Sequence, residues 1–143
     1  KPLWNNDARP RHMLGIGWID DIFELVERGI DTFDCVHMTR IARHGNLLIS
    51  PDSGGSVKNK FRIKIKKGIF KEDKNKIDKN CNCKTCKTHT RSQMHNLIKK
   101  DKMKFGRLAT IHNISFMLSL MEKIRQSIKE NKFNELKEYY LKN

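Results

Sequence analysis

The apolar positions at the start of this 143-residue chain change from strand spacing to helix spacing and back. His12 to Gly17 is short, apolar and ends in glycines, which predicts a buried strand that runs into a tight turn. Trp18 to Arg28 follows helical spacing, with one apolar face formed by Trp18, Ile22, Leu25 and Val26. Ile30 to Val36 predicts a second strand. A strand, a helix and a strand joined by short links form a βαβ unit, so we expect the two strands to be parallel.

This βαβ unit is too small to bury its own apolar surface. Two parallel strands and one helix need further strands beside them before the sheet is stable. The chain also begins with Lys1 rather than Met, in a polar segment that contains proline. We therefore expect residues 1–45 to be the last βα units of a larger α/β barrel, and the chain to be a piece of a longer polypeptide.

The pattern changes after residue 45. Asn46 to Ser50 and Phe61 to Lys66 are β-prone runs, and residues 51–55 between them are rich in turn-forming proline and glycine. This arrangement predicts an antiparallel hairpin with a flexible inserted tip.

Three helices are expected in the C-terminal half. Thr90 to Lys100 predicts a short helix that buries Met94, Leu97 and Ile98. Leu108 to Lys129 predicts the longest helix, with an inner stripe formed by Ile114, Met117, Leu118, Met121, Ile124 and Ile128. Asn131 to Asn143 mixes charged and apolar residues, and we expect a last helix that frays at its end.

Three of the four cysteines fall within six residues, at Cys81, Cys83 and Cys86. Neighbours this close cannot all pair in unstrained disulfides, because a bridge needs its two α-carbons about 5.5 Å apart. Three thiolates on one loop can instead converge on a tetrahedral Zn²⁺ and need one more ligand. A site closed by four protein ligands is structural, because no position stays open for water or substrate. We therefore predict one structural zinc ion, with residues 46–143 forming the hairpin, a zinc-binding subdomain and closing helices.

The local sequence leaves the fourth ligand open. His89, His95 and His112 all follow Cys86, and spacing alone favours His89. His112 lies near the head of the longest predicted helix. If His112 is the ligand, the metal ties that helix to the cysteine loop.

The chain carries 30 basic and 16 acidic residues, which gives a net charge of +14. This excess is compatible with a polyanionic partner such as nucleic acid, although a solvated basic surface has the same composition. No apolar run reaches the ~18 residues that a membrane-spanning helix needs. Cysteines arranged for metal binding rather than for pairing indicate a reducing compartment, so we expect a cytoplasmic protein.

One acid stands out as a candidate for catalysis. Asp34 falls near the carboxyl end of the second predicted strand, where α/β barrels place catalytic groups. Its neighbours are apolar, and a carboxylate among them is costly unless it has a partner or a role. Arg40 and Arg43 follow and could hold a phosphate near this acid. A capping or ion-paired Asp34 and a solvated arginine loop are the alternative interpretation.

Five short segments resemble the tRNA-guanine transglycosylase family in order and approximate spacing. They are Gly15-Ile16-Gly17, Phe33-Asp34-Cys35-Val36, Thr39-Arg40-Ile41-Ala42-Arg43, Cys81-x-Cys83-x-x-Cys86 and Thr110-Ile111-His112-Asn113. The resemblance runs through nearly the whole chain. It implies an α/β fold, the C-terminal portion of a (β/α)8 TIM barrel with an inserted zinc-binding subdomain made of a β-hairpin and helices.

The resemblance also implies a role for each matching residue. Asp34 resembles the nucleophile that attacks the ribose of the wobble guanosine in the tRNA anticodon loop; guanine leaves, and a 7-deazaguanine base, queuine or a precursor, then displaces the enzyme. The zinc ligands match Cys81, Cys83, Cys86 and His112, which favours His112 over His89. The RNA-contacting segments match Gly15, Ile16, Gly17, Trp18, Ile19, Asp20 and Asp21, and further on Thr39, Arg40, Ile41, Ala42 and Arg43. The implied partners are tRNAs of the GUN type and a second subunit, identical or paralogous.

The chain departs from the family pattern in places. Met38 stands where proline usually precedes the Thr-Arg pair, and Leu14 stands where methionine usually forms part of the base pocket. The family's second catalytic aspartate lies in barrel strands that this chain lacks, so we expect no exchange activity from the chain alone. The alternative function is a non-catalytic, zinc-containing accessory or tRNA-binding subunit of the same superfamily. A free-standing zinc-ribbon nucleic-acid binder would not explain an acid at a strand end.

Overall fold

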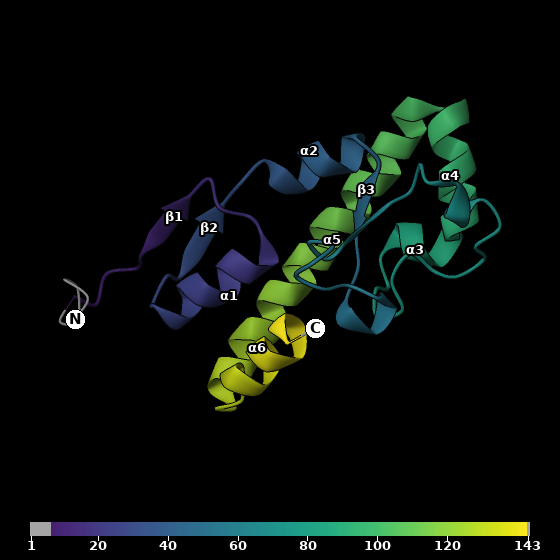
Figure 1. The fold of residues 1–143 in the computed structure, drawn as a ribbon. Coiled ribbons are helices and arrows are strands. Elements are labelled where there is room, and N and C mark those ends of the chain that lie inside the picture. The colour runs from purple at the N-terminus through teal and green to yellow at the C-terminus, as the bar shows by residue number, and fades with distance from the viewer. Residues whose placement is uncertain (1–6, 143) are drawn as a thin grey trace.

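Two small sheets and one long helix organise residues 7–142, the part of the chain that the computed structural model describes (Figure 1). The first sheet is a parallel pair joined by a helix: β1 (His12–Leu14), α1 (Ile19–Glu27) and β2 (Thr32–Asp34). The second sheet is an antiparallel hairpin of β3 (Asn46–Leu48) and β4 (Arg62–Lys64). The predicted βαβ unit and the predicted hairpin are both confirmed, but the expectation that the first strand is buried is wrong, because His12 and Leu14 of β1 are exposed.

Within residues 7–142 the remaining elements are five α-helices and two 3₁₀ turns. They are α2 (His37–Arg43), the 3₁₀ turns η1 (Pro51–Ser53) and η2 (Gly68–Phe70), α3 (Lys84–Thr88), α4 (Arg91–Lys100), α5 (Lys102–Lys129) and α6 (Phe133–Leu141). In Figure 1, α5 runs diagonally through the molecule, with the βαβ unit toward one side and α3 and α4 toward the other. Helices α2, α3, α4 and α6 and strand β3 all contact α5.

Local sequence signals explain where these helices begin and end. Gly29 ends α1 with a φ of +94°, and the amide of Gly29 donates to the carbonyl oxygen of Val26 at 2.9 Å, as in a left-handed cap. Thr90 and Gln93 form a reciprocal capping box at the start of α4. The side chain of Asp101 accepts a hydrogen bond from the amide of Lys104 and so starts α5. This cap is why α5 begins at Lys102, six residues before the predicted start at Leu108.

Buried apolar residues form two clusters along α5. The first joins the hairpin to α3, α4 and the first half of α5, and includes Leu47, Ile65, Met94 and Phe105. The second joins α1, α2 and α6 to the second half of α5, and includes Phe23, Phe61 and Tyr140. The second cluster contains residues from both sides of the predicted boundary at residue 45, so the two predicted segments share a core.

The inner stripe predicted for α5 is wrong. Of its six residues only Ile124 is buried, whereas Ile114, Leu118 and Ile128 are 40%, 66% and 50% exposed. The face that α5 buries consists of Phe105, Leu108, Ala109, His112, Asn113, Phe116, Leu120, Ile124 and Ser127. A count of apolar positions missed this face, because polar side chains with buried partners occupy its centre.

Two shorter helices bury faces that differ slightly from the predicted ones. Helix α1 buries Ile19, Ile22 and Phe23, while Leu25 and Val26 are only half-buried. Helix α4 buries Met94 and Ile98 as predicted, but its third buried residue is His95 rather than Leu97. In α4 the ring Nδ1 of His95 hydrogen-bonds to the carbonyl oxygen of Ile65 at 2.7 Å, which explains how a polar ring is accommodated there.

Residues 37–43 form a helix, whereas the sequence analysis treated this arginine-containing segment as a loop. Met38, Ile41 and Ala42 have the spacing of one helical face and are buried against α5 and the hairpin. Arg40 and Arg43 are exposed on the same helix. Their separation is thus fixed by α2 rather than by a flexible loop.

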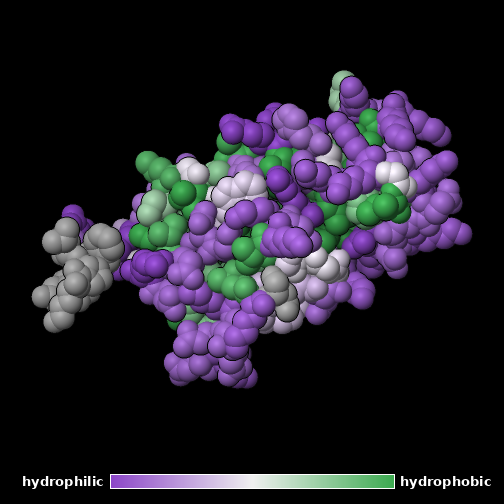
Figure 2. All heavy atoms as spheres, viewed as in Figure 1, coloured by the Kyte–Doolittle hydropathy of each residue, from purple (hydrophilic) through white to green (hydrophobic). Residues whose placement is uncertain are grey.

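The parallel strand pair keeps exposed apolar residues. Leu14 is 71% exposed and Val36 is 51% exposed, and Figure 2 shows apolar atoms gathered at the end of the molecule that carries β1 and β2. Within residues 7–142 no third strand joins this sheet. The expectation that further strands continue this sheet in a larger barrel stays a prediction. No helix of the described residues combines the length and the apolarity that a bilayer crossing requires.

Candidate metal centre

Three sulfur atoms and one imidazole nitrogen converge where α3 meets α5. The ligand atoms of Cys81, Cys83, Cys86 and His112 all lie within 4.8 Å of one another. Nδ1 of His112 is 3.3 Å from Sγ of Cys86 and 3.6 Å from Sγ of Cys83. A tetrahedral zinc ion with metal–sulfur bonds of about 2.3 Å separates its sulfur ligands by roughly 3.8 Å. The donor set and its spacing therefore fit one structural Zn²⁺.

The helix α3 presents two of the sulfurs. Cys83 caps α3, and its Sγ accepts a hydrogen bond from the backbone amide of Cys86 at 3.4 Å. Thr85 lies between them and donates from its hydroxyl to the carbonyl oxygen of Leu108 at 2.7 Å. This buried hydrogen bond holds α3 against α5, which carries His112. The cluster is therefore assembled by packing as well as by its own ligands.

The other nitrogen of His112 is also fixed. Nε2 lies 2.8 Å from the carbonyl oxygen of Leu48 in β3, and a carbonyl only accepts, so Nε2 carries the proton. Nδ1 is then unprotonated, and its lone pair is available to a metal ion held among the sulfurs. A ligating histidine whose second nitrogen donates to a backbone carbonyl is the usual arrangement in metal sites.

Three thiols packed this closely cannot all ionise without a compensating positive charge. Hydrogen bonding to Cys81 and Cys86 lowers the pKa of Cys83, whereas hydrogen bonding to Cys81 and Cys83 raises the pKa of Cys86. Burial lowers the pKa of His112, but hydrogen bonds to the sulfurs outweigh it and raise that pKa to about 9. A divalent cation favours thiolates and a neutral imidazole together, and so removes this conflict.

The two alternative histidines are engaged elsewhere. Nδ1 of His89 lies 2.7 Å from the hydroxyl of Thr88, and His95 is bonded to Ile65 as described above. Neither belongs to the cluster. The spacing argument that favoured His89 was therefore misleading, and His112 completes the set.

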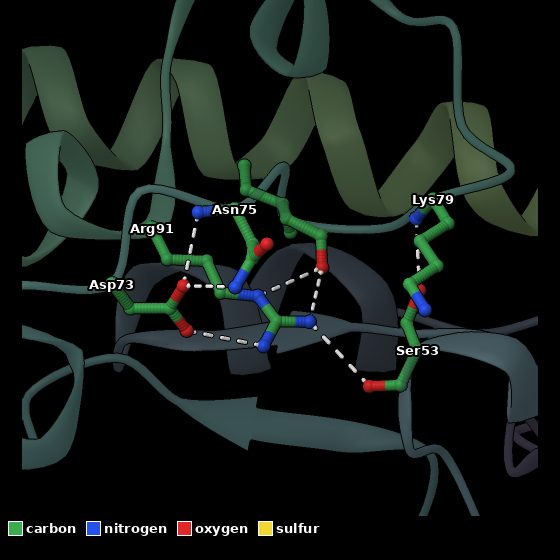
Figure 3. A network of polar contacts seen from close by, with 6 residues as sticks. Ser53, Asp73, Asn75, Lys79 and Arg91 are labelled. Atoms are coloured by element: carbon green, nitrogen blue, oxygen red, sulfur yellow. Dashed lines mark hydrogen bonds and ion pairs between the residues drawn. The ribbon is translucent and has the colours of Figure 1, made fainter.

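A half-buried guanidinium orders the segment that leads into the cysteines (Figure 3). Arg91, at the start of α4, pairs with Asp73 at 3.3 Å and donates to the carbonyl oxygen of Ile77 at 3.0 Å. It also reaches the carbonyl oxygen of Ser53 at 3.4 Å, and Ser53 accepts from the amide of Lys79 at 2.8 Å. These bonds fasten residues 73–79 to η1 and α4, so the loop enters the metal centre from a fixed direction.

Two buried polar residues missed by the sequence analysis connect the metal centre to the rest of the fold. Asn113, beside His112, accepts from the amide of Leu48 at 2.9 Å and donates to the carbonyl oxygens of Asn46 at 3.0 Å and Met38 at 3.2 Å. Asp78 accepts from the amide and hydroxyl of Ser50 at 2.9 and 2.6 Å. Asn113 is next to the ligand His112, and Asp78 lies in the loop that leads to Cys81. This nearness to a ligand was the sequence signal that could have identified them.

Asp34 lies at the carboxyl end of β2, as predicted, but its environment differs from the expectation. Its side chain is 66% exposed rather than enclosed by apolar neighbours. The amide of Gly15 donates to its backbone carbonyl at 2.9 Å and approaches Oδ1 at 3.4 Å. Nε2 of His12 lies 3.6 Å from the same Oδ1. The carboxylate is thus available to a ligand and has one imidazole beside it.

The residues predicted to contact RNA divide by exposure. Ile19, Ile41 and Ala42 are buried and pack in the core. The exposed members of the two segments include Gly15, Asp21, Arg40 and Arg43, while Ile16, Trp18, Asp20 and Thr39 are half-buried and Gly17 is buried. The structure brings the first segment next to Asp34 through Gly15. The first segment also lies next to α2, because the ring centroids of Trp18 and His37 are 3.8 Å apart.

Comparison with known proteins assigns the family. The family model described as queuine tRNA-ribosyltransferase matches residues 4–143. The chain belongs to this family. A relative from Archaeoglobus fulgidus, named for the same enzyme, is 46% identical over 135 residues, which cover 94% of this chain and 34% of the relative. Queuine tRNA-ribosyltransferases of Roseiflexus sp. (strain RS-1) and Thermoanaerobacter sp. (strain X514) are each 38% identical, over 94% and 95% of this chain and 32% and 34% of theirs.

The chain spans about a third of the length of these queuine tRNA-ribosyltransferase relatives. Its mixed helix and sheet architecture, with three cysteines and a histidine at metal-binding distance, fits the zinc subdomain of the family. The metal would hold α3 against α5 and would leave no position open for a substrate. The metal centre itself therefore offers no position for catalysis.

Proposed function

We propose that this chain is the C-terminal part of a tRNA-guanine transglycosylase. The enzyme would exchange the wobble guanine of GUN-type tRNA anticodons for a 7-deazaguanine base, queuine or a precursor, in queuosine modification. The supporting observation is the exposed carboxylate of Asp34 at the end of β2, in a chain of the queuine tRNA-ribosyltransferase family. Parallel α/β sheets use this edge for catalytic groups.

Asp34 would act as the nucleophile. Its carboxylate oxygen forms an ester with C1′ of the wobble ribose as guanine departs with the electrons of the glycosidic bond. The departing guanine takes up a proton. The ring nitrogen of the incoming base then loses its proton as it forms a new bond to C1′ and releases the carboxylate, so two displacements retain the configuration. The target nucleotide has to leave its stack to reach an acid at a strand end. The Gly15 amide, 3.4 Å from Oδ1, helps to orient the carboxylate.

Helix α2 would hold the RNA next to this acid. Arg40 and Arg43 are exposed on α2, and guanidinium groups pair well with phosphate oxygens. Asn113 ties α2 to the hairpin through the carbonyl oxygens of Met38 and Asn46. In this proposal the metal centre supports the site indirectly, because His112 and Asn113 are adjacent on α5. A tRNA substrate also favours the cytoplasmic location expected from the sequence.

The remaining parts of the site would come from outside the chain. His12, Leu14, Thr32 and Asp34 are all exposed residues at alternating positions of β1 and β2, so they share one face of the sheet. In a closed barrel, further strands would pair with the edges of this sheet and would extend this face. We therefore expect no guanine exchange from the isolated chain; incorporation of labelled guanine into tRNA by residues 1–143 alone would contradict this.

The decisive experiment replaces the acid in the full-length protein. We expect Asp34→Asn to reduce exchange of labelled guanine by at least about a thousandfold, because a nucleophile is lost, while tRNA affinity stays within about twofold. The matched control is Glu72→Gln, an exposed carboxylate-to-amide change in the segment before the cysteines. A covalent tRNA adduct trapped on the original protein should be absent from the Asp34 variant.

The same experiment separates the two functions considered. Unchanged exchange in Asp34→Asn would remove Asp34 as the nucleophile. If the full-length protein binds tRNA but exchanges no base, whether position 34 is Asp or Asn, it would instead be the non-catalytic, zinc-containing subunit. A homodimer or a pair with a paralogous subunit is proposed from the family resemblance alone.

A further inference from the structure

Strand β4 carries a row of basic side chains on its outer face. Arg62, Lys64 and Lys66 point outward along β4 and the residues after it, and the residues between them, Ile63 and Ile65, are buried. Side chains two residues apart on one face of a strand are separated by about 7 Å. The buried residues hold the strand in the core, and the basic residues are therefore presented at regular intervals to the outside.

Two shallow hollows flank this row. One of about 480 Å³ is lined by His44, Gly45, Asn46, Arg62, Lys64, Lys66 and Lys67. The other, of about 380 Å³, adds Lys58 and Lys60 and again includes Arg62, Lys64 and Lys67. Neither lining contains an aspartate or a glutamate. We call Lys58, Arg62, Lys64, Lys66 and Lys67 together the β4 basic surface.

The charges of the β4 basic surface are not neutralised by the described part of the chain. None of its five residues forms an ion pair there. Elsewhere in the fold, Lys137 pairs with Glu24 at 2.6 Å and with Glu27 at 2.9 Å, and nearby Lys60 pairs with Asp20 at 2.9 Å. A concentrated positive field of this kind attracts a polyanion and raises its association rate.

The β4 basic surface is continuous with the proposed RNA-contacting residues. The guanidinium of Arg62 lies 5.2 Å from the centre of the Trp18 ring, which in turn contacts the ring of His37 at the start of α2. Burial, followed by the charges of Arg62 and Arg40, lowers the pKa of His37, so both charges lie close to one ring. His44, directly after α2, lines the same hollow as Arg62. A polyanion bound at α2 can therefore extend onto β4 without a gap.

We infer that the β4 basic surface binds the phosphate backbone of the tRNA strand that continues from the anticodon loop past α2. This inference rests on the proposed function. Long flexible side chains can follow a phosphodiester chain, and contacts to phosphate carry no sequence information, so the contact is independent of sequence. Its role is to position the substrate and to supply affinity, and it does not touch the reacting atoms.

The test removes three charges from this surface in the full-length protein. The variant Lys64→Ala/Lys66→Ala/Lys67→Ala changes exposed side chains only. The matched control, Lys129→Ala/Lys132→Ala/Lys142→Ala, removes the same charge at the C-terminal end of α5 and at the two ends of α6. Both proteins are first checked for thermal unfolding and for zinc content. Binding of GUN-type tRNA is then measured at several salt concentrations, alongside steady-state exchange.

We expect the β4 variant to bind tRNA at least about tenfold more weakly at ~0.1 M salt, with a salt slope reduced by roughly 0.7 per lost phosphate contact. KM for tRNA should rise by a similar factor while kcat stays within about twofold. The control should change neither quantity by more than about twofold. Equal losses in both variants would mean a general charge effect, and no loss in the β4 variant would leave an acidic protein as the partner; either result overturns the inference.

Binding and exchange also keep the two proposals apart. A full-length protein without exchange activity would refute the proposed function, yet a β4-dependent salt slope would still support an RNA surface. Exchange with unchanged tRNA affinity in the β4 variant would refute the surface and leave the proposed function in place. A single variant, Lys64→Glu, repeats the measurement should the triple variant fold poorly.

Discussion

His112 joins the metal centre to the hairpin, because its Nε2 donates a hydrogen bond to the carbonyl oxygen of Leu48 at 2.8 Å. Its other nitrogen faces the sulfurs of Cys83 and Cys86. One side chain thus connects α5, the cysteine loop and β3, which are separated by up to 64 positions in the sequence. The metal therefore contributes to the packing of the hairpin as well as to the fold of its own loop.

The first prediction concerns this ligand. Replacing His112 by Gln should weaken zinc binding by more than about a hundredfold, the loss that outer hydrogen-bonding partners of metal ligands already cause. It should also lower the thermal unfolding temperature, because metal binding is coupled to folding. Metal content after dialysis and the unfolding temperature are the measurements.

His89→Gln is the matched control, since spacing alone pointed to His89 and the structure does not include it in the cluster. It should retain about one zinc per chain. Zinc retained by the His112 variant and lost by the His89 variant would reverse the assignment of the fourth ligand.

The second prediction concerns Asn113. Its side chain satisfies the amide of Leu48 and the carbonyl oxygens of Asn46 and Met38, all in a buried region. Asn113→Ala leaves these groups without partners, and each buried unpaired group costs about 1–3 kcal/mol. We expect the free energy of unfolding to fall by about 3 kcal/mol while zinc stoichiometry stays at one.

Chemical denaturation followed by circular dichroism measures this loss. Asn96→Ala, an exposed change on α4, should alter the free energy of unfolding by less than about 0.5 kcal/mol. A comparable effect of the two substitutions would show that Asn113 does not connect α2, β3 and α5.

The parts of the fold that could be predicted from the sequence are those with short-range signals. Glycines and alternation of apolar residues located the βαβ unit and the hairpin, and the spacing of Cys81, Cys83 and Cys86 indicated a metal site. These signals are local because turns, caps and clustered ligands are made by residues close in sequence. The fourth ligand, His112, lies 26 positions after Cys86, and the local spacing of the cysteines could not identify a residue so distant in the sequence.

The buried face of α5 could not be predicted by counting apolar residues. His112 and Asn113 are polar, yet both are fully buried because each finds partners on β3. The apolar residues Ile114 and Leu118 are exposed on another side of the helix. Which face a helix buries depends on the partners that the rest of the fold provides, and those partners are distant in the sequence.

The third prediction concerns Gly17, where β1 leads into α1. A β-carbon there would lie 3.0 Å from Sγ of Cys35 and 3.1 Å from the β-carbon of His37. The β-carbon of Cys35 is also 3.1 Å away, and the β-carbons of Cys35 and His37 cannot move aside without shifting the backbone. We expect Gly17→Ala to lower the free energy of unfolding by about 1–3 kcal/mol, as overpacking does.

Gly68→Ala is the control, because a β-carbon at Gly68 meets nothing within 4 Å. Its unfolding free energy should match that of the original protein to within about 0.5 kcal/mol. If both glycine variants were equally stable, the close approach of Gly17 to Cys35 would not be a constraint on the fold.

The fourth prediction is a pH dependence at His37. Burial and the charges of Arg62 and Arg40 lower the pKa of His37 from its ordinary value of 6.5, and its Nε2 is buried without a partner among the described residues. The folded protein therefore binds this proton less tightly than the unfolded chain. Stability from the neutral ring is fully present above pH 6.5 and is lost as the pH falls below it, because the unfolded state then takes up more protons.

His37→Phe keeps a ring against Trp18 and removes the proton site. Between pH 7.5 and 5.5 the unfolding free energy of the original protein should fall more steeply than that of His37→Phe. Between pH 7.5 and 9 the two curves should run parallel, since His37 does not titrate there. The metal ligands and His89 are the same in both proteins, so their titration cancels when the two curves are compared. Parallel curves at low pH as well would mean that burial and the charges of Arg62 and Arg40 do not lower the pKa of His37.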